Sequence, residues 1–132
     1  MASYLLDSDA VIDYLNGKAA SVSLVSTLYQ QGNRLYVCDV VIAEVYSGLK
    51  PPDREKARKL VDGFDFLLTS SEIARQAGEW RYSYARLGKS LSTMDCLLAA
   101  TAYAHDASVV TGNQDDYPMP EVLLVALPRT TG

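Results

Sequence analysis

Long hydrophobic runs, paired cysteines and histidines are scarce in this sequence of 132 residues. The longest apolar stretches, Val40 to Ala43 and Val122 to Leu127, are far shorter than the roughly 20 residues that a membrane-spanning helix needs, so we predict no membrane span. Cys38 and Cys96 are far apart in apolar surroundings and lack the paired spacing of a zinc site, which favours buried free thiols. His105 has no cysteine or histidine partner to complete a transition-metal site, and we expect it at a helix end or on the surface.

The first residues lack the basic and apolar regions of a secretory signal, so we expect a cytoplasmic protein. Hydrophobic residues make up 48% and charged residues 21% of the chain, which excludes a disordered chain and a disulfide scaffold. The length predicts a single domain over residues 1–132.

The net charge of −4 is the opposite of that of a simple nucleic-acid coat protein. The charges are unevenly distributed, however. Nine of the twelve basic residues fall between Lys50 and Lys89, whereas the segment up to Asp13 has three aspartates and no base. The two signs are therefore expected to form separate surfaces, although the run from Arg54 to Lys59 also fits a solvated helix face with alternating charges.

Short apolar strands alternate with amphipathic segments along the chain. We expect strands at residues 4–6, 35–38, 66–68, 108–111 and 122–127, with helices between them. Thr69 and Glu72 have the form of a capping box for a helix that ends near Leu87, and Ser92 introduces the next helix. Because buried parallel strands need helices on both faces, the pattern predicts a three-layer α/β/α sandwich with a central, mainly parallel sheet.

Several acidic residues follow the predicted strands, where open parallel sheets bind ligands. Asp7 ends the first strand, Glu44 follows the second one on a helix, Asp95 opens a later helix, and Asp116 follows the strand that ends at Thr111. Carboxylates brought together repel one another and therefore require protonation or a cation. Oxygen ligands favour Mg²⁺ or Mn²⁺, which polarise a phosphoryl oxygen and generate hydroxide from bound water in metal-dependent nucleases.

Each of these acids also has a purely structural interpretation. Asp95 completes an S-x-x-D capping pattern with Ser92, and Asp7 fits a turn or helix N-cap. Glu44 stands in an apolar segment where an unpaired carboxylate is costly, and an exposed helix face is its alternative. The remaining acids fit loop or helix N-terminal positions: Asp9, Asp13, Asp115 and Asp116.

Four segments form a recognisable set: LLDSDAVIDYL from Leu5, VIAEVYSGL from Val41, STMDCLLAATA from Ser92 and VVTGNQDDY from Val109. Together they resemble the PIN-domain ribonucleases. Their order and spacing look most like the VapC toxins of type II toxin–antitoxin pairs, and the resemblance covers essentially the whole chain.

This resemblance implies a metal-dependent endoribonuclease. Asp7, Glu44 and Asp95 would hold Mg²⁺ or Mn²⁺ with Asp116 as the fourth acid, and the Ser8 hydroxyl would support the site. The family also implies a homodimer and a small antitoxin protein that blocks the RNA groove.

The last segment matches the family pattern T-x-N-x-x-D followed by an aromatic residue. Thr111, Asn113, Asp116 and Tyr117 supply it, and Asp115 is an additional acid. Because Asn113 stands where some relatives have an acid, Asp116, Asp115 and Asn113 all remain open as the fourth ligand.

We hypothesise in-line attack of water on an RNA phosphodiester, leaving a 5′-phosphate. Candidate contacts to the RNA backbone are the basic residues Lys50 to Lys59, Arg81, Arg86 and Lys89. Tyr46, Tyr82 and Tyr84 are candidates for stacking on unpaired bases, although Tyr82, Tyr84 and Trp80 also fit helix packing.

Two rival interpretations remain. Asp7-Ser8-Asp9-Ala10-Val11 resembles the motif of haloacid-dehalogenase-like phosphatases, in which Asp7 would be the nucleophile and Asp9 the general acid, with Asp115–Asp116 holding Mg²⁺. That interpretation leaves Glu44 and Asp95 unused. The other rival is a PIN-like interaction module that has lost turnover, against which the retained acids argue.

Overall fold

The computed structural model describes residues 1–128. Its elements, in chain order, are β1 (Ser3–Leu6), α1 (Ser8–Leu15), α2 (Ala19–Gln30), β2 (Arg34–Cys38), α3 (Asp39–Ser47), η1 (Pro51–Asp53), α4 (Arg54–Val61), β3 (Asp65–Leu67), α5 (Ser71–Arg86), α6 (Thr93–Ala104), β4 (Ser108–Thr111), η2 (Gln114–Asp116) and β5 (Leu124–Ala126). Strands and helices alternate as the sequence predicts.

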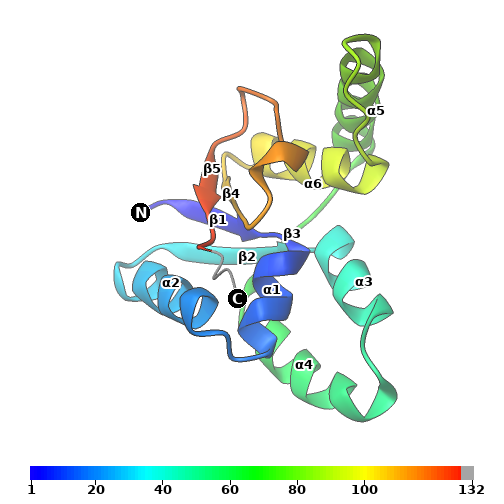
Figure 1. The fold of residues 1–132 in the computed structure, drawn as a ribbon. Helices are drawn as coiled ribbons and strands as arrows, with labels where there is room; N and C mark the ends of the chain where they lie inside the picture. The colour runs from blue at the N-terminus through cyan, green and yellow to red at the C-terminus, as the bar shows by residue number, and fades with distance from the viewer. Residues whose placement is uncertain (129–132) are drawn as a thin grey trace.

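The five strands form one sheet in the order β3-β2-β1-β4-β5, and every neighbouring pair is parallel. Leu5 in the central strand lies opposite Tyr36 of β2 and Val109 of β4. Figure 1 shows α1, α2 and α4 on one side of the sheet and α5 and α6 on the other. The predicted three-layer α/β/α sandwich with a parallel sheet is therefore confirmed.

Each of the two central strands carries consecutive apolar residues because helices cover both of their faces. Leu5 and Leu6 of β1 and Val109 and Val110 of β4 are fully buried. This core fixes where the central strands end, and with them the position of the residues that follow.

The strand order reverses between β1 and β4. From β1 the chain continues to β2 and then β3 on one side of β1, whereas β4 and β5 lie on the other side. In such sheets the carboxyl ends of the two strands at the reversal border a ligand-binding crevice. Asp7 lies there directly after β1, and its backbone N–H donates to the carbonyl of Val110 in β4 at 3.1 Å.

One predicted helix cap is wrong. The N-cap of α5 is Ser70, whose Oγ accepts from the N–H of Ile73 at 3.2 Å. Thr69 instead donates its hydroxyl proton to Asp39 at 2.8 Å. A tertiary contact between residues that follow the neighbouring strands β2 and β3 thus replaces the predicted capping box of Thr69 with Glu72.

The two cysteines and the single histidine lie where the sequence predicts them. Cys38 and Cys96 are buried free thiols. His105 is the C-cap of α6, and its Nε2 lies 2.9 Å from the carbonyl oxygen of Leu68. Within residues 1–128, no helix combines the length and apolar character required to cross a membrane.

Candidate metal centre

Asp7 is placed by the end of β1 and serves as the N-cap of α1. Its Oδ1 accepts from the N–H of Ala10 at 2.9 Å, and the side chain is buried. Burial raises the pKa of Asp7 to about 6, and the charges of Asp9 and Asp95 add to the rise, against hydrogen bonds from Thr111 and Ala10. The ionised form of the Asp7 carboxyl is therefore unfavourable unless a positive charge lies nearby.

Glu44 reaches the same region from α3, in the connection after β2. The Glu44 side chain is half-buried, and this burial is the largest cause of its raised pKa. The charges of Asp95, Asp9 and Asp116 raise the pKa of Glu44 further, whereas a hydrogen bond with the Ser8 hydroxyl lowers it. Glu44 is therefore within electrostatic reach of acids from three other elements.

Asp95 lies in the first turn of α6. Its N–H donates to Oγ of the N-cap Ser92 at 3.0 Å. Burial raises the pKa of the half-buried Asp95 carboxyl, the hydrogen bond with Ser92 opposes the rise, and the charges of Asp116 and Asp9 add to it. Capping of α6 and membership of the acidic group therefore coexist at this residue.

The loop after β4 supplies the fourth acid. Asp116 is half-buried in η2 and acts electrostatically on Glu44 and Asp95. Asp115 and Asn113 are exposed, and Asp115 lines a separate shallow hollow beside β5. Of the three candidates for the open position, Asp116 is the one whose charge raises the pKa values of Glu44 and Asp95.

Tyr117 is the common neighbour of the four acids. It is buried, and burial raises the pKa of its phenol, as do the charges of Asp7, Asp95, Asp116 and Glu44 in decreasing order. All four predicted acids thus lie within electrostatic reach of one side chain. The sequence shows Tyr117 only as an aromatic residue after the last acid, and a central position in the group was not predicted for it.

Two further residues join this acidic group. Asp9, which the sequence suggests as a helix N-terminal charge, does lie in the first turn of α1, but its charge also raises the pKa values of Asp7, Glu44 and Asp95. Thr111 is fully buried and accepts from the N–H of Asn113 at 2.9 Å while its side chain hydrogen-bonds Asp7.

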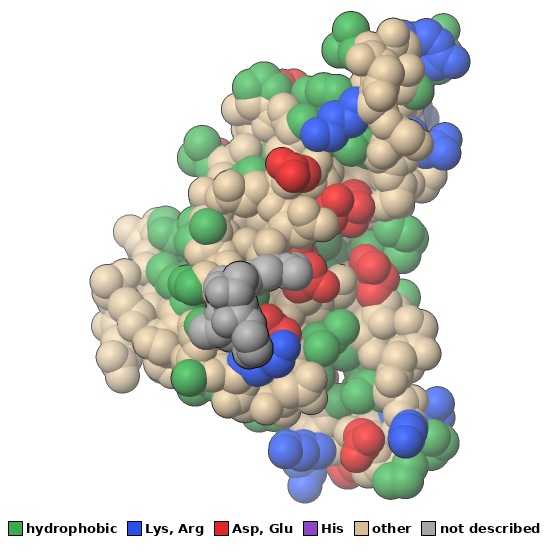
Figure 2. Space-filling view, in the orientation of Figure 1, with side chains coloured by type: hydrophobic (Ala, Val, Ile, Leu, Met, Phe, Trp, Pro, Cys, Tyr) green, Lys and Arg blue, Asp and Glu red, His purple; other side chains and the backbone are tan. Residues whose placement is uncertain are grey.

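The donor chemistry of the group suits a hard divalent cation, because every acidic donor is a carboxylate oxygen and the charges repel one another. In the described part of the chain, however, no three His, Cys, Asp or Glu side chains already form a set that could hold one ion. Binding would therefore require side-chain rotations that bring the carboxylates together. Figure 2 shows acidic side chains across the middle of one face, with most Lys and Arg side chains toward its two ends.

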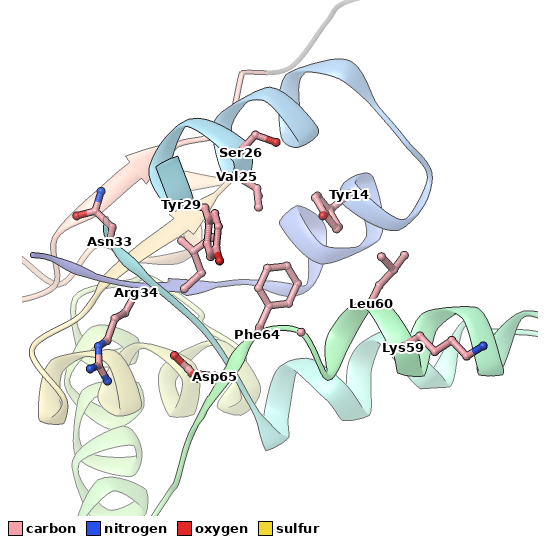
Figure 3. A pocket seen from close by; sticks show the side chains of 12 residues that line it. Tyr14, Val25, Ser26, Tyr29, Asn33, Arg34, Lys59, Leu60, Phe64 and Asp65 are labelled. Atoms are coloured by element: carbon pink, nitrogen blue, oxygen red, sulfur yellow. The ribbon is translucent and has the colours of Figure 1, made fainter. Parts of the chain in front are cut away.

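A cavity of about 500 Å³ lies away from these acids, between α1, α2, α4 and the start of β2 and β3. Figure 3 shows the rings of Tyr14, Tyr29 and Phe64 around it, and the Tyr14 and Phe64 rings meet edge to face with centroids 5.6 Å apart. None of the four predicted acids lines this cavity.

The basic residues predicted to contact RNA have different surroundings. Arg58 of α4 pairs with Glu55 at 2.7 Å and with Asp62 at 3.6 Å on the same helix, as expected for a solvated face with alternating charges. On α5, Arg86 lies over the exposed ring of Tyr82, 4.2 Å from its centroid.

The other aromatic side chains of α5 take part in packing. Trp80 is buried and its ring lies 5.7 Å from that of Tyr103. Tyr84 donates its hydroxyl proton to the carbonyl of Pro118 at 3.3 Å. The packing interpretation therefore holds for Trp80 and Tyr84, and Tyr82 is the exposed ring of the three.

Comparisons with known proteins show the family of the chain. The family model of the PIN domain matches residues 4–120. The chain is 31% identical over 119 residues to Ribonuclease VapC10 of Mycobacterium tuberculosis, covering 90% of this chain and 89% of the relative. It is 26% identical over 115 residues to Ribonuclease VapC19 of the same organism, covering 87% of this chain and 92% of the relative.

Solved structures share the fold at lower identity. VapBC2 from Rickettsia felis, bound to a DNA fragment from its promoter, has a TM-score of 0.81 at 20% identity and covers 94% of this chain and 98% of its own. A toxin–antitoxin complex from Klebsiella pneumoniae has a TM-score of 0.76 at 22% identity, with 96% and 99% covered.

Proposed function

The chain belongs to the PIN domain family, and on this premise we propose that it is an endoribonuclease and the toxin of a toxin–antitoxin pair. It would hydrolyse RNA phosphodiester bonds at a site where carboxylates hold a divalent metal ion. Relatives named as ribonucleases match this chain over most of both lengths, which supports the activity.

The observation that carries the proposal is the grouping of the acids around Tyr117. Asp7, Asp95, Asp116 and Glu44 come from four different connections, and each acts on the pKa of this one phenol. A fold that needed these acids only for capping and solvation would not require them in one region, because their mutual repulsion costs free energy.

In this proposal Asp7, Glu44, Asp95 and Asp116 hold Mg²⁺ or Mn²⁺. When bound, such an ion supplies Lewis-acid polarisation of the phosphoryl group and a nucleophilic water at neutral pH. Two hydroxyl side chains support the ligands: Thr111 hydrogen-bonds Asp7, and Ser8 hydrogen-bonds Glu44. These hydrogen bonds lower the pKa values of the two carboxyls and so favour their ionised form.

Cleavage of a structured RNA by the purified chain tests the proposal. We expect cleavage with Mg²⁺ or Mn²⁺ that stops with EDTA and leaves 5′-phosphate ends. Asp7→Asn should abolish cleavage, whereas the exposed Asp115→Asn serves as a matched control and should retain it. Cleavage that persists in EDTA, or an active Asp7→Asn variant, would exclude the proposed site.

The proposed partners are an RNA substrate, a cognate antitoxin and a second copy of this chain. Structural neighbours of the chain are toxin–antitoxin complexes, which supports the antitoxin. Light scattering should give twice the 14.4 kDa of one chain for a homodimer. Expression should arrest growth, and co-expression of the protein encoded beside this chain should restore it.

A further inference from the structure

Arg81 of α5 is attached to the segment that leads into α6. Its Nε donates to the carbonyl of Leu91 at 3.1 Å. Leu91 is buried and directly precedes Ser92, whose Oγ caps the N–H of Asp95. A single hydrogen bond therefore connects the Arg81 guanidinium to the turn that presents one of the proposed metal ligands.

The same part of α5 is held at a second point. The hydroxyl of Tyr84, three residues further along, donates to the carbonyl of Pro118 at 3.3 Å. Pro118 follows Asp116 and Tyr117 in the loop after β4. The C-terminal half of α5 is thus held against both connections that carry acids from this side of the sheet, so the position of Arg81 relative to them is well defined.

No salt bridge takes up the charge of Arg81 in the described residues. Within residues 1–128 the ion pairs use Lys18 and Arg58 as their cations, and Arg81 takes part in none.

An arginine that uses Nε for a backbone carbonyl still has four N–H groups at its two Nη atoms. These groups match two oxygens of one phosphate, which lysine cannot do in the same geometry. The side chain is exposed, so a phosphate can approach it. By contrast, Arg58 already faces two carboxylates on its own helix.

We propose that Arg81 binds a backbone phosphate of the RNA strand beside the acidic group through its Nη atoms while its Nε holds the carbonyl of Leu91. The inference rests on the proposed function and adds a positioning residue to it. Arg81 would offset the repulsion between the acidic face and the RNA and align the strand with the start of α6.

Binding of a short fluorescein-labelled oligouridylate, measured by anisotropy in EDTA over a KCl series, tests this without relying on turnover. Arg81→Gln should weaken binding about tenfold, the scale of a charged hydrogen bond. It should also reduce the slope of log K against log[salt] by about 0.7, the value for one phosphate on a single strand. Arg81→Lys should keep the wild-type slope with a lower affinity, because it keeps the charge and loses the bidentate geometry.

Arg75→Gln is the matched control, since Arg75 is an exposed arginine on the same helix, and it should leave affinity and slope unchanged. Thermal unfolding of each variant checks that the fold is intact.

Wild-type affinity and slope in Arg81→Gln would overturn the inference while leaving the nuclease proposal standing. An Arg81→Lys variant with the reduced slope of Arg81→Gln would also overturn it, because the effect would then follow from the lost contact with Leu91 alone. A wild-type chain that neither binds nor cleaves RNA would overturn both proposals.

Discussion

Asp7 combines a structural role with a charge that the fold does not favour. As N-cap it satisfies the N–H of Ala10, a contact that stabilises α1 by about 1 kcal/mol. As a buried carboxylate beside other acids it has a pKa of about 6 against an ordinary value of 3.8. The destabilisation of the ionised carboxylate exceeds the stabilisation by the cap, because the rise in pKa corresponds to about 3 kcal/mol.

This predicts a pH-dependent gain of stability in Asp7→Asn without metal. Asparagine can still cap α1, but it carries no charge. Because the unfolded chain releases the Asp7 proton at lower pH than the folded one, wild-type stability falls as pH rises from about 4 to about 6 and stays low above that. In urea titrations with EDTA, Asp7→Asn should exceed wild type by about 1–3 kcal/mol at pH 7.5 and by little at pH 4.

The exposed Asp115→Asn serves as the control for loss of one negative charge and should change stability little at either pH. An Asp7→Asn variant that is less stable than wild type at pH 7.5 would contradict the burial argument.

The acids themselves were predictable, whereas the tertiary contacts of Tyr117 and Arg81 were not. Asp7 and Asp95 stand next to predicted strand or helix ends and Glu44 stands inside the helix after the second strand, and these positions with the residue types were sufficient to select them. Tyr117 and Arg81 gain their significance from contacts with residues far along the chain, and neither contact has a local sequence signal.

At the scale of elements, the start of α6 carries both a cap and an acid. Ser92 accepts from the N–H of Asp95 and hydrogen-bonds its carboxyl as well. Ser70 caps α5 in the same way, through the N–H of Ile73, at the start of α5. The two serines thus allow the effect of lost helix capping to be separated from an effect on the acidic group.

Ser92→Ala and Ser70→Ala should each lower the free energy of unfolding by about 1 kcal/mol. RNA cleavage should fall only in Ser92→Ala, because the Ser92 hydroxyl also hydrogen-bonds the Asp95 carboxyl and favours its ionised form. Urea titration and initial cleavage rates on the same preparations measure the two effects. Equal cleavage rates in both variants would show that Ser92 acts on stability alone.

The existence of the elements followed from the sequence more closely than their ends did. Runs of consecutive apolar residues such as Leu35 to Cys38 predict buried strands because both faces of a parallel sheet are covered. The start of α5 was misplaced because Thr69 and Ser70 are chemically equivalent caps, and the contact of Thr69 with Asp39 decides between them. The last strand, Leu124–Ala126, is shorter than the predicted 122–127, although the carbonyl of Leu123 still accepts from the N–H of Val109 in β4 at 2.9 Å.

At the scale of the whole molecule, the sheet order creates the acidic group. Local patterns predict strands but not which strands are neighbours, so the reversal between β1 and β4 was beyond the sequence. That reversal brings the end of β1 next to the end of β4 and places helices of both outer layers around the same crevice. The repulsion among the acids is therefore built into the topology, and removing it stabilises the whole domain.

This coupling predicts that Mg²⁺ or Mn²⁺ stabilises the entire chain. A ligand that binds only the folded state adds about 2.7 kcal/mol at a free concentration of 100 times its Kd. For a domain of this size such a gain raises the Tm by roughly 10 °C. Wild type and Asp115→Asn should show this rise in thermal unfolding over a metal series at pH 7.5, whereas Asp7→Asn should start from a higher Tm in EDTA and rise little. An equal rise of Tm with metal in wild type and Asp7→Asn would mean that the metal binds elsewhere. Only a metal ion bound at a site that contains Asp7 would relieve the repulsion that involves this carboxylate.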